Sequence, residues 1–280
     1  MQSRIGVCSW SLRPTSPEDL AQKVRAVGLD AIQLALDPLR TGAWPTAQTV
    51  ATLGAAGIGI RSGMLAMRGE DYTSLESIRR TGGLRPDEYW SDNLAAVEAN
   101  ATIVAQLGLK LVTFHAGFIP HERGDPLRAV LGERVRAVAD RLAGVGARVG
   151  LETGQETADH LLGFLEELQH PAVGVNFDPA NMILYGRGDP VAALRALSAH
   201  VVQVHVKDAV PAATPGTWGR EVPVGTGAVD WPGFFTVLRQ AAFSGDLMIE
   251  REAGDTRSGD IDAARRRVAT WIGQPEGSEH

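Results

Sequence analysis

VVQVHVKD, residues 201–208, decides the fold. It is a short run of apolar and β-branched residues that ends in charged ones, and similar runs occupy 148–152 (RVGLE), 173–178 (VGVNFD) and 247–250 (LMIE). Nearly continuous apolar content is typical of parallel strands covered on both faces. Since an unpaired buried charge is costly, we expect the polar residues that close these runs to lie at the edge of the sheet.

Eight such runs recur along the chain, and segments with helical periodicity separate most of them. The predicted strands are 5–10, 31–36, 58–64, 109–115, 148–152, 173–178, 201–207 and 247–250. The predicted helices include 17–27, 93–107, 127–145, 157–168 and 232–241. Repeated β-then-α units predict an α/β protein, a single (β/α)₈ TIM barrel over residues 1–280.

An open, doubly wound sheet is the alternative fold. It would bind its ligand at a topological switch point, often beside a glycine-rich turn after the first strand. The sequence CSWSLRP (8–14) is not a phosphate-binding loop of that kind. The uneven strand spacing leaves two long connections, at about 66–86 and 209–230. Both follow a strand, so we expect them to cover a ligand on the C-terminal face of a barrel.

The composition and charge of the chain limit the partners and the location that we expect for the protein. The 280 residues include 27 basic and 33 acidic side chains, a net charge of −6, and the basic residues are scattered. Because such a surface repels a phosphate backbone, we expect no nucleic-acid partner. The N-terminus lacks the apolar run of a secretory signal and no stretch of about 18 apolar residues occurs, so we expect a cytoplasmic protein with no membrane partner.

Four residues whose side chains can bind a metal stand at or near the ends of four consecutive predicted strands. They are Glu152, Asp178, His205 and Glu250. In a barrel these strand ends lie side by side around one mouth, where three carboxylates would repel one another. A divalent cation would relieve that repulsion, and one imidazole with three carboxylates suits Mn²⁺ best, with Mg²⁺, Co²⁺ or Zn²⁺ as alternatives. The sequence therefore predicts one metal ion per chain.

Several motifs extend this reading: VCSWSL (7–12), LETGQET (151–157), FDPANMILYG (177–186), VHVKD (204–208), VPVGTGAVDWPGFF (222–235) and IEREAG (249–254). With these motifs the chain resembles the sugar phosphate isomerase/epimerase family of xylose isomerase-like barrels. That group includes ketose 3-epimerases, hydroxypyruvate isomerases, inosose dehydratases and relatives of endonuclease IV. The resemblance covers nearly the whole chain.

The resemblance implies a metal-dependent isomerase or epimerase of a keto-sugar or related polyol-derived substrate, working by proton transfer through an enediolate. It aligns the four strand-end residues with the family's metal ligands, and Glu152 and Glu250 also with its catalytic acid/base pair. Chemistry supports this role, because a metal bound to a carbonyl and its adjacent hydroxyl acidifies the carbon-bound proton. The expected partner is a small sugar, and a homodimer or homotetramer is a candidate assembly.

Other residues are candidates for substrate contacts. These are His115 at the end of a strand, Glu156, Asn181, Lys207 and Trp10. Lys207 shares a strand face with His205, so it is expected to hold an oxyanion or to pair with Asp178 or Glu250. Tyr72 and Trp90 are further candidates for an apolar wall beside a sugar ring. Asn181 departs from the pattern of ketose 3-epimerases, which commonly have a histidine there.

Three other functions remain open. A lyase or dehydratase acting on a 3-oxo-glycoside or an inosose would use the same metal and base, but a leaving group would depart. An endonuclease IV-like DNA-repair enzyme would need three metals, extra histidine ligands and a basic face. A non-catalytic sugar-binding barrel would not need both glutamates. Cys8 is the only cysteine, and its place in an apolar strand predicts a packed thiol with no chemical role.

Overall fold

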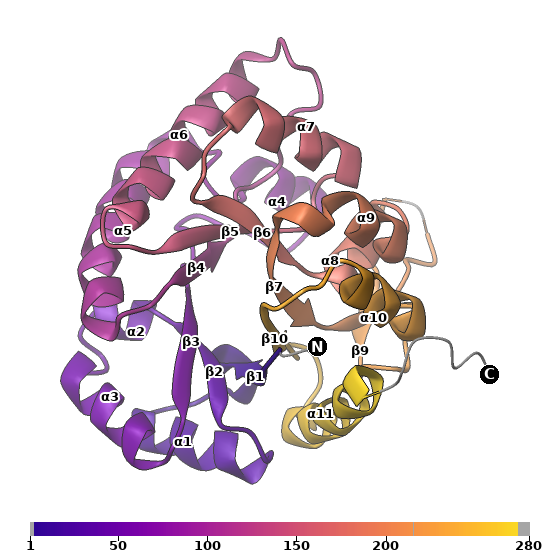
Figure 1. Cartoon of the computed structure of the whole chain (residues 1–280). Helices are drawn as coiled ribbons and strands as arrows, with labels where there is room; N and C mark the ends of the chain where they lie inside the picture. Colours follow the sequence, from indigo (N-terminus) through magenta and orange to yellow (C-terminus); the bar gives the residue numbers. More distant parts are fainter. Residues whose placement is uncertain (1–2, 215, 274–280) are drawn as a thin grey trace.

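The computed structural model describes residues 3–214 and 216–273, and within them eight parallel strands close into a barrel. Figure 1 shows the strands at the centre and the long helices outside them. In barrel order the strands are β1 (Ile5–Cys8), β10 (Asp246–Ile249), β7 (Val201–Val206), β6 (Val173–Phe177), β5 (Arg148–Glu152), β4 (Leu111–Phe114), β3 (Gly59–Met64) and β2 (Ala31–Ala35). The predicted (β/α)₈ fold is therefore confirmed.

Helices connect successive strands and cover the outside of the barrel (Figure 1). They are α1 (Pro17–Ala26), α2 (Asp37–Arg40), α3 (Thr46–Ala55), α4 (Leu75–Thr81), α5 (Asp87–Leu107), α6 (Pro126–Ala143), α7 (Ala158–Leu168), α8 (Pro179–Leu184), α9 (Pro190–Leu197), α10 (Trp231–Gln240) and α11 (Arg257–Gly273). Several begin at a side chain that accepts a backbone N–H, such as Ser16 before α1 and Asp230 before α10. These caps satisfy N–H groups that a helix start leaves unpaired.

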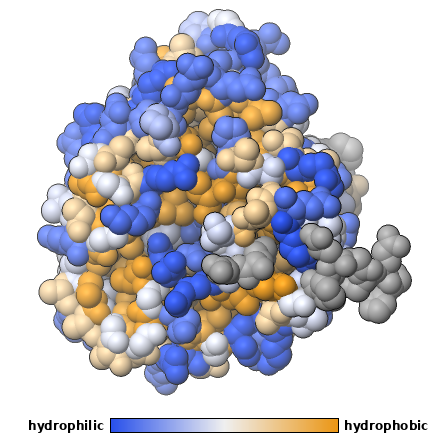
Figure 2. Space-filling view, viewed as in Figure 1, coloured by the Kyte–Doolittle hydropathy of each residue, from blue (hydrophilic) through white to orange (hydrophobic). Residues whose placement is uncertain are grey.

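Apolar residues fill the layer between the strands and the helices. Val112, Val149, Val175 and Val204 on the outer face of the barrel belong to one buried cluster that includes residues of α1, α5, α6 and α10. In the space-filling view hydrophilic side chains cover much of the outer ring, and hydrophobic ones show mainly nearer the centre (Figure 2). No described helix is long and apolar enough to cross a membrane.

The inside of the barrel is polar rather than apolar. Gln33, Thr113, Asn176, Gln203 and His205 project inward from four different strands and are all fully buried. Ser62 Oγ donates to Gln203 Oε1 at 2.6 Å, and Gln203 Nε2 donates to Asn176 Oδ1 at 3.2 Å. Because buried polar groups need partners, this network fixes the inward side chains beneath the strand ends.

The two long connections carry short elements of their own. Residues 66–86 include α4, and residues 209–230 include most of an antiparallel pair, β8 (Asp208–Val210) with β9 (Arg220–Val222). The first strand was predicted to run to Trp10, but β1 ends at Cys8 and a 3₁₀ turn, η1 (Ser9–Leu12), follows. That turn brings Trp10 over the C-terminal mouth of the barrel, next to Glu250.

Candidate metal centre and active site

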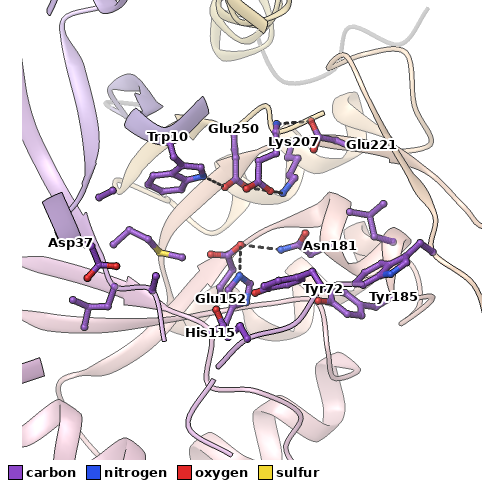
Figure 3. Close-up of a pocket in the computed structure, with 18 residues that line it drawn as sticks. Trp10, Asp37, Tyr72, His115, Glu152, Asn181, Tyr185, Lys207, Glu221 and Glu250 are labelled. Atoms are coloured by element: carbon purple, nitrogen blue, oxygen red, sulfur yellow. Dashed lines mark hydrogen bonds and ion pairs between the residues drawn. The ribbon is translucent and has the colours of Figure 1, made fainter. Parts of the chain in front are cut away.

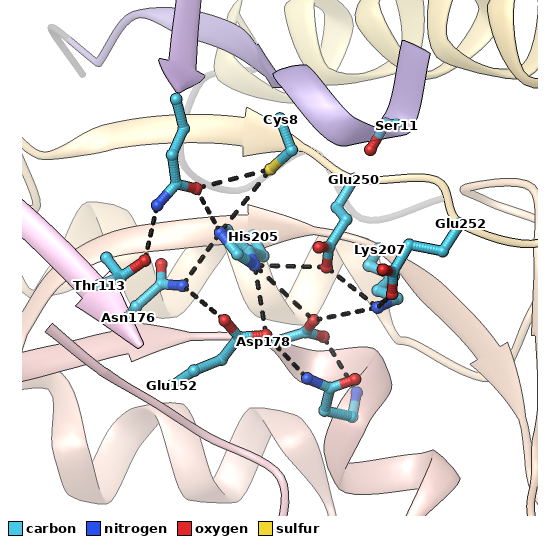
Figure 4. Close-up of polar contacts among 12 residues, drawn as sticks. Cys8, Ser11, Thr113, Glu152, Asn176, Asp178, His205, Lys207, Glu250 and Glu252 are labelled. Atoms are coloured by element: carbon cyan, nitrogen blue, oxygen red, sulfur yellow. Dashed lines mark hydrogen bonds and ion pairs between the residues drawn. The ribbon is translucent and has the colours of Figure 1, made fainter. Parts of the chain in front are cut away.

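The four strand-end residues converge at the C-terminal mouth of the barrel. One ligand atom from each of Glu152, Asp178, His205 and Glu250 lies within 4.8 Å of all the others. His205 Nδ1 is 3.4 Å from Glu152 Oε1, 3.3 Å from Glu250 Oε2 and 4.0 Å from Asp178 Oδ2. Glu152 and His205 lie on β5 and β7, and Asp178 and Glu250 directly follow β6 and β10; these four strands are neighbours in the barrel. The predicted convergence is therefore present in the structure (Figure 4).

Two atoms of this cluster are buried without a hydrogen-bond partner among the described residues. They are His205 Nδ1 and Asp178 Oδ2. The other oxygen of Asp178 accepts from Asn181 N at 2.9 Å, at the start of α8. A buried polar atom that lacks a partner is costly. Two such atoms, aimed at one point among further carboxylates, match the donor set of a divalent cation. The cluster could therefore hold a metal ion.

The tautomer of His205 fits a metal ligand. Its Nε2 lies 2.6 Å from Gln33 Oε1, an oxygen that can only accept, and 3.0 Å from Asn176 Nδ2, and a proton on Nε2 satisfies the shorter of the two contacts. Gln33 Nε2 in turn donates to Thr113 Oγ1 at 2.6 Å, which fixes the orientation of the amide. Nδ1 faces the carboxylates. Burial would lower the pKa of His205, but the neighbouring Cys8, Glu152 and Glu250 raise it well above its usual value, so a cation bound there would take the place of the Nδ1 proton. The role of Gln33 was not predicted from the sequence.

Glu250 is held by donors on one side of the mouth. Trp10 Nε1 donates to its Oε1 at 2.7 Å, and Lys207 Nζ donates to its Oε2 at 3.0 Å (Figure 3). Burial alone would raise the pKa of Glu250, but the charges of Lys207 and His205 hold that pKa well below its usual range. Glu250 is therefore an ionised carboxylate at neutral pH.

Glu152 is held by a different set of groups. Asn181 Nδ2 donates to its Oε1 at 2.9 Å, and His115 Nε2 lies 3.5 Å from the same oxygen (Figure 3). Burial opposes ionisation, yet His115 and His205 lower the pKa of Glu152 below its ordinary value. For Asp178, burial outweighs the nearby charge of Lys207 and raises the pKa to about 8. The cluster thus contains two carboxylates that ionise readily and one that gains most from a cation.

A cavity of about 550 Å³ opens above this cluster. Four of the five predicted substrate contacts line it, namely Trp10, His115, Asn181 and Lys207, together with Tyr72. Residues that were not predicted also line it: Asp37, Glu70, Tyr185, Trp218, Glu221 and Glu252. Most of these follow a strand or belong to a long connection, where a single sequence has no regular pattern to reveal them.

Two sequence-based assignments need correction. Glu156 does not line the cavity: it is buried, and its Oε1 accepts from Ile119 N at 2.8 Å. It therefore holds the loop after β4 and is not placed to contact a ligand there. Trp90 is also outside the cavity and packs under the guanidinium of Arg134, 5.2 Å from the ring centroid. The side chains of Glu156 and Trp90 both turn into the protein and away from the cavity.

The Cys8 thiol is buried, as the sequence predicted, and Lys207 forms the predicted pairs with Asp178 and Glu250, while its contact with a substrate stays a prediction. Burial raises the pKa of the Cys8 thiol to about 12, which makes it an inert packed group. Lys207 Nζ lies 3.9 Å from Asp178 Oδ2 and 3.0 Å from Glu250 Oε2, and it also donates to Glu252 Oε2 at 2.7 Å. Burial would lower the pKa of Lys207, but Glu250 and Glu252 raise it well above its usual value.

The fold is a closed (β/α)₈ barrel, and a cluster of carboxylates and one imidazole lies at its C-terminal mouth. These two features define the class of the protein: a barrel with a potential metal site. The family model described as the xylose isomerase-like TIM barrel matches residues 21–272. The chain therefore belongs to that family.

Individual relatives agree with this assignment. A crystal structure of a xylose isomerase domain protein from Planctomyces limnophilus is 32% identical, with a TM-score of 0.84, and covers 89% of this chain and 91% of its own. A xylose isomerase-like TIM barrel protein from Mycobacterium smegmatis, solved in complex with magnesium, is 17% identical, with a TM-score of 0.71, over 96% of this chain and 97% of its own. The second likeness shows the fold alone.

Two curated proteins are similar over shorter stretches. The uncharacterized protein YihM of Escherichia coli is 25% identical over 153 residues, which are 54% of this chain and 45% of that protein. The L-ribulose-5-phosphate 3-epimerase UlaE of Salmonella paratyphi A is 31% identical over 111 residues, which are 40% of this chain and 36% of that protein. The aligned region thus spans less than half the length of either relative.

Proposed function

We propose that this chain is a divalent-metal-dependent isomerase or epimerase of a keto-sugar or related polyol-derived substrate. The observation that carries the proposal is the pair of glutamates at the floor of one cavity, Glu152 and Glu250, each ionised by its own set of partners. The name of UlaE, a sugar 3-epimerase, supports the same reaction class.

Each glutamate can act as a base toward a substrate in the cavity. Glu250 is oriented by Trp10 and Lys207, and Glu152 by Asn181 and His115, so the two carboxylates approach a ligand from different sides (Figure 3). A divalent cation held by the cluster would polarise a carbonyl and its neighbouring hydroxyl, which acidifies the proton on the adjacent carbon. The preferred ion in this proposal is Mn²⁺.

The fate of the proton defines the reaction. If one glutamate removes a proton and the other, after taking a proton from solvent, delivers it to the opposite face of the same carbon, the configuration inverts and the reaction is an epimerisation. If the proton is delivered to the neighbouring carbon, a ketose and an aldose interconvert. In both reactions a carboxyl group exchanges its proton with solvent between the two steps, so solvent hydrogen enters the product.

The test is incorporation of solvent deuterium. The Mn²⁺-loaded protein is incubated in deuterated water with L-ribulose, D-fructose and other ketoses, and the products are examined by NMR and mass spectrometry. We expect one deuterium at the reacting carbon with the native chain and a loss of at least about 10²-fold in rate with Glu152→Gln or Glu250→Gln. Glu166→Gln, an exposed change on α7, is the matched control and should leave the rate unchanged.

Two results would contradict the proposal. Release of water or an aglycone from a 3-oxo-glycoside or an inosose, without return of a proton, would assign the site to elimination. Absence of exchange and of elimination across the panel, with sugars still bound, would leave a binding protein.

A further inference from the structure

The wall of the cavity above the metal centre is rich in carboxylates. Besides Glu152 and Glu250 at its floor, four acidic side chains line it, which we call the acidic rim: Asp37, Glu70, Glu221 and Glu252. Three of them have a cationic partner. Asp37 pairs with Arg40 at 2.8 Å, Glu221 with Arg251 at 2.6 Å, and Glu252 with Lys207. Asp37, Glu221 and Glu252 line the cavity, whereas Arg40 and Arg251 do not.

Cationic donors suited to an anion are few on the same wall: besides Lys207 there is His115, whose Nε2 lies 3.5 Å from Glu152 Oε1. Among the described residues that line the cavity, Lys207 is the lone lysine and arginine does not occur. Its ammonium is already committed to Glu250 Oε2 at 3.0 Å and Glu252 Oε2 at 2.7 Å. A phosphate group is normally bound by an arginine fork, by free lysine or by several backbone N–H groups. A phosphate ester would instead face like charge on several sides.

One part of the wall is aromatic and apolar. Tyr185 and Trp218 pack edge to face with their ring centroids 4.9 Å apart, and Leu184 lies beside them in the cavity lining. Tyr72 lines the cavity from the connection before α4, and 46% of its surface is exposed. We call Tyr72, Leu184, Tyr185 and Trp218 the aromatic wall. An exposed aromatic face beside carboxylate acceptors suits a ligand with apolar C–H faces and hydroxyl donors.

We propose that the cavity takes an uncharged, unphosphorylated sugar whose hydroxyls donate to the acidic rim and whose ring lies against the aromatic wall. This inference rests on the proposed isomerase or epimerase function and names its substrate class. It separates the chain from the relative UlaE, whose name gives a sugar 5-phosphate as substrate. The separation follows from charge, since Lys207 is neutralised by its two carboxylate partners.

The experiment compares each free sugar with its own phosphate ester. The Mn²⁺-loaded protein is titrated with L-ribulose and L-ribulose 5-phosphate, and with D-fructose and D-fructose 6-phosphate, in a calorimeter and under solvent-deuterium exchange. We expect each free sugar to bind at least tenfold more tightly than its ester. An ester that binds as tightly as the free sugar, or more tightly, would overturn the inference, as would failure of both free sugars to bind at millimolar concentration.

Variants test the two surfaces separately. The double change Asp37→Asn with Glu252→Gln removes two rim charges, so the discrimination against the esters should fall severalfold. Tyr72→Ala should weaken binding of the free sugars about fivefold or more. Tyr72→Phe keeps the ring and should bind the free sugars as tightly as the native chain. Tyr89→Phe, outside the cavity, is the control for a tyrosine change. Unchanged discrimination against the esters in the double variant would contradict the role of the acidic rim. Unchanged binding of the free sugars by Tyr72→Ala would contradict the role of the aromatic wall.

The outcomes also separate this inference from the proposed function. Tight binding of free sugars without deuterium exchange would keep the substrate class and reject the isomerase. Exchange with a higher kcat/KM for the phosphate esters would keep the isomerase and reject the substrate class.

Discussion

Gln33 and His205 are joined by a hydrogen bond of 2.6 Å on the side of the imidazole ring that faces away from the carboxylates. Gln33 lies on β2 and His205 on β7, so the contact crosses the inside of the barrel. Because Gln33 Oε1 accepts the Nε2 proton, Nδ1 is the ring nitrogen that faces the candidate metal position, and a cation bound there would displace the Nδ1 proton. The orientation of the ligand thus depends on a residue that touches neither metal nor substrate.

Gln33→Met tests this positioning role. The change keeps the length of the side chain but removes the acceptor, so we expect Mn²⁺ affinity to fall about 10- to 100-fold. The readout is calorimetric titration of the protein with Mn²⁺, which does not depend on activity. Gln203→Met is the matched control, because Gln203 is equally buried in the barrel and hydrogen-bonds Asn176 and Ser62 instead. Equal affinities in the two variants would contradict the positioning role.

Lys207→Met should change the pH dependence of catalysis. The Lys207 charge helps to hold the pKa of Glu250 low, against the effect of burial. Without it the pKa rises, and the ionised base is lost at a higher pH when the solution is acidified. We expect the acid limb of the kcat/KM profile to move upward by about 1 to 3 pH units.

Unfolding experiments on the same lysine provide a second readout. Loss of Lys207 breaks a buried ion pair and leaves His205 as the remaining cation beside Glu250, which should cost about 3 kcal/mol of stability. Lys23→Met removes a partly exposed pair with Asp19 and should cost at most about 1 kcal/mol. An unmoved acid limb in Lys207→Met, in a variant that still folds, would show that another group sets the pKa of the base.

The strand ends could be predicted from sequence, and the interior of the barrel could not. Glu152, Asp178, His205 and Glu250 follow apolar runs, and the parallel topology alone brings such ends together. Gln33 and Gln203 also interrupt apolar strands, which is a visible signal. Their partners, however, depend on barrel register. The pairing shifts between Ile32 and Gln33 and again between Val175 and Asn176, and a periodic pattern does not contain such shifts.

Residues on connections were harder still to predict. Tyr72 was recognised as a candidate only by its type, and Glu221 and Trp218 were missed, because their positions depend on how the long connections fold back over the mouth. Glu156 shows the opposite error. It stands four residues after Glu152, but the loop turns its carboxylate toward Ile119 N and away from the cavity.

Asp178→Asn should separate stability from metal binding. Asp178 Oδ2 is buried without a hydrogen-bond partner, whereas Oδ1 caps α8 through Asn181 N, and an asparagine keeps that acceptor. In the presence of a chelator we expect the variant to be at least as stable as the native chain, because folding of the native chain at neutral pH requires Asp178, whose pKa is raised to about 8, to take up a proton, and an asparagine requires none. With Mn²⁺ at about 100 times its Kd the native chain should gain about 2.7 kcal/mol, and the variant far less.

Denaturant unfolding at neutral pH, with chelator and then with Mn²⁺, measures both quantities for Asp178→Asn. The exposed change Asp159→Asn on α7 is the control and should gain as much from Mn²⁺ as the native chain. A full Mn²⁺ response in Asp178→Asn would show that Asp178 is not a ligand. A large loss of stability in the chelated variant would show that its charge is already compensated in the native protein.

Glu156 should make the protein less stable as the pH rises. Burial raises the pKa of Glu156 from 4.5 to about 7, although Ile119 N donates to its carboxylate. Between these two values the unfolded chain loses the proton and the folded chain keeps it, so the free energy of unfolding falls with rising pH, by on the order of 3 kcal/mol in total.

Glu156→Gln keeps the acceptor and cannot ionise, so it should raise the free energy of unfolding little at pH 4 and most above pH 7. Urea unfolding from pH 4 to 8 measures this, with Glu166→Gln as the exposed control. A stabilisation by Glu156→Gln that is the same at every pH would show that Glu156 ionises in the folded protein as it does in the unfolded chain.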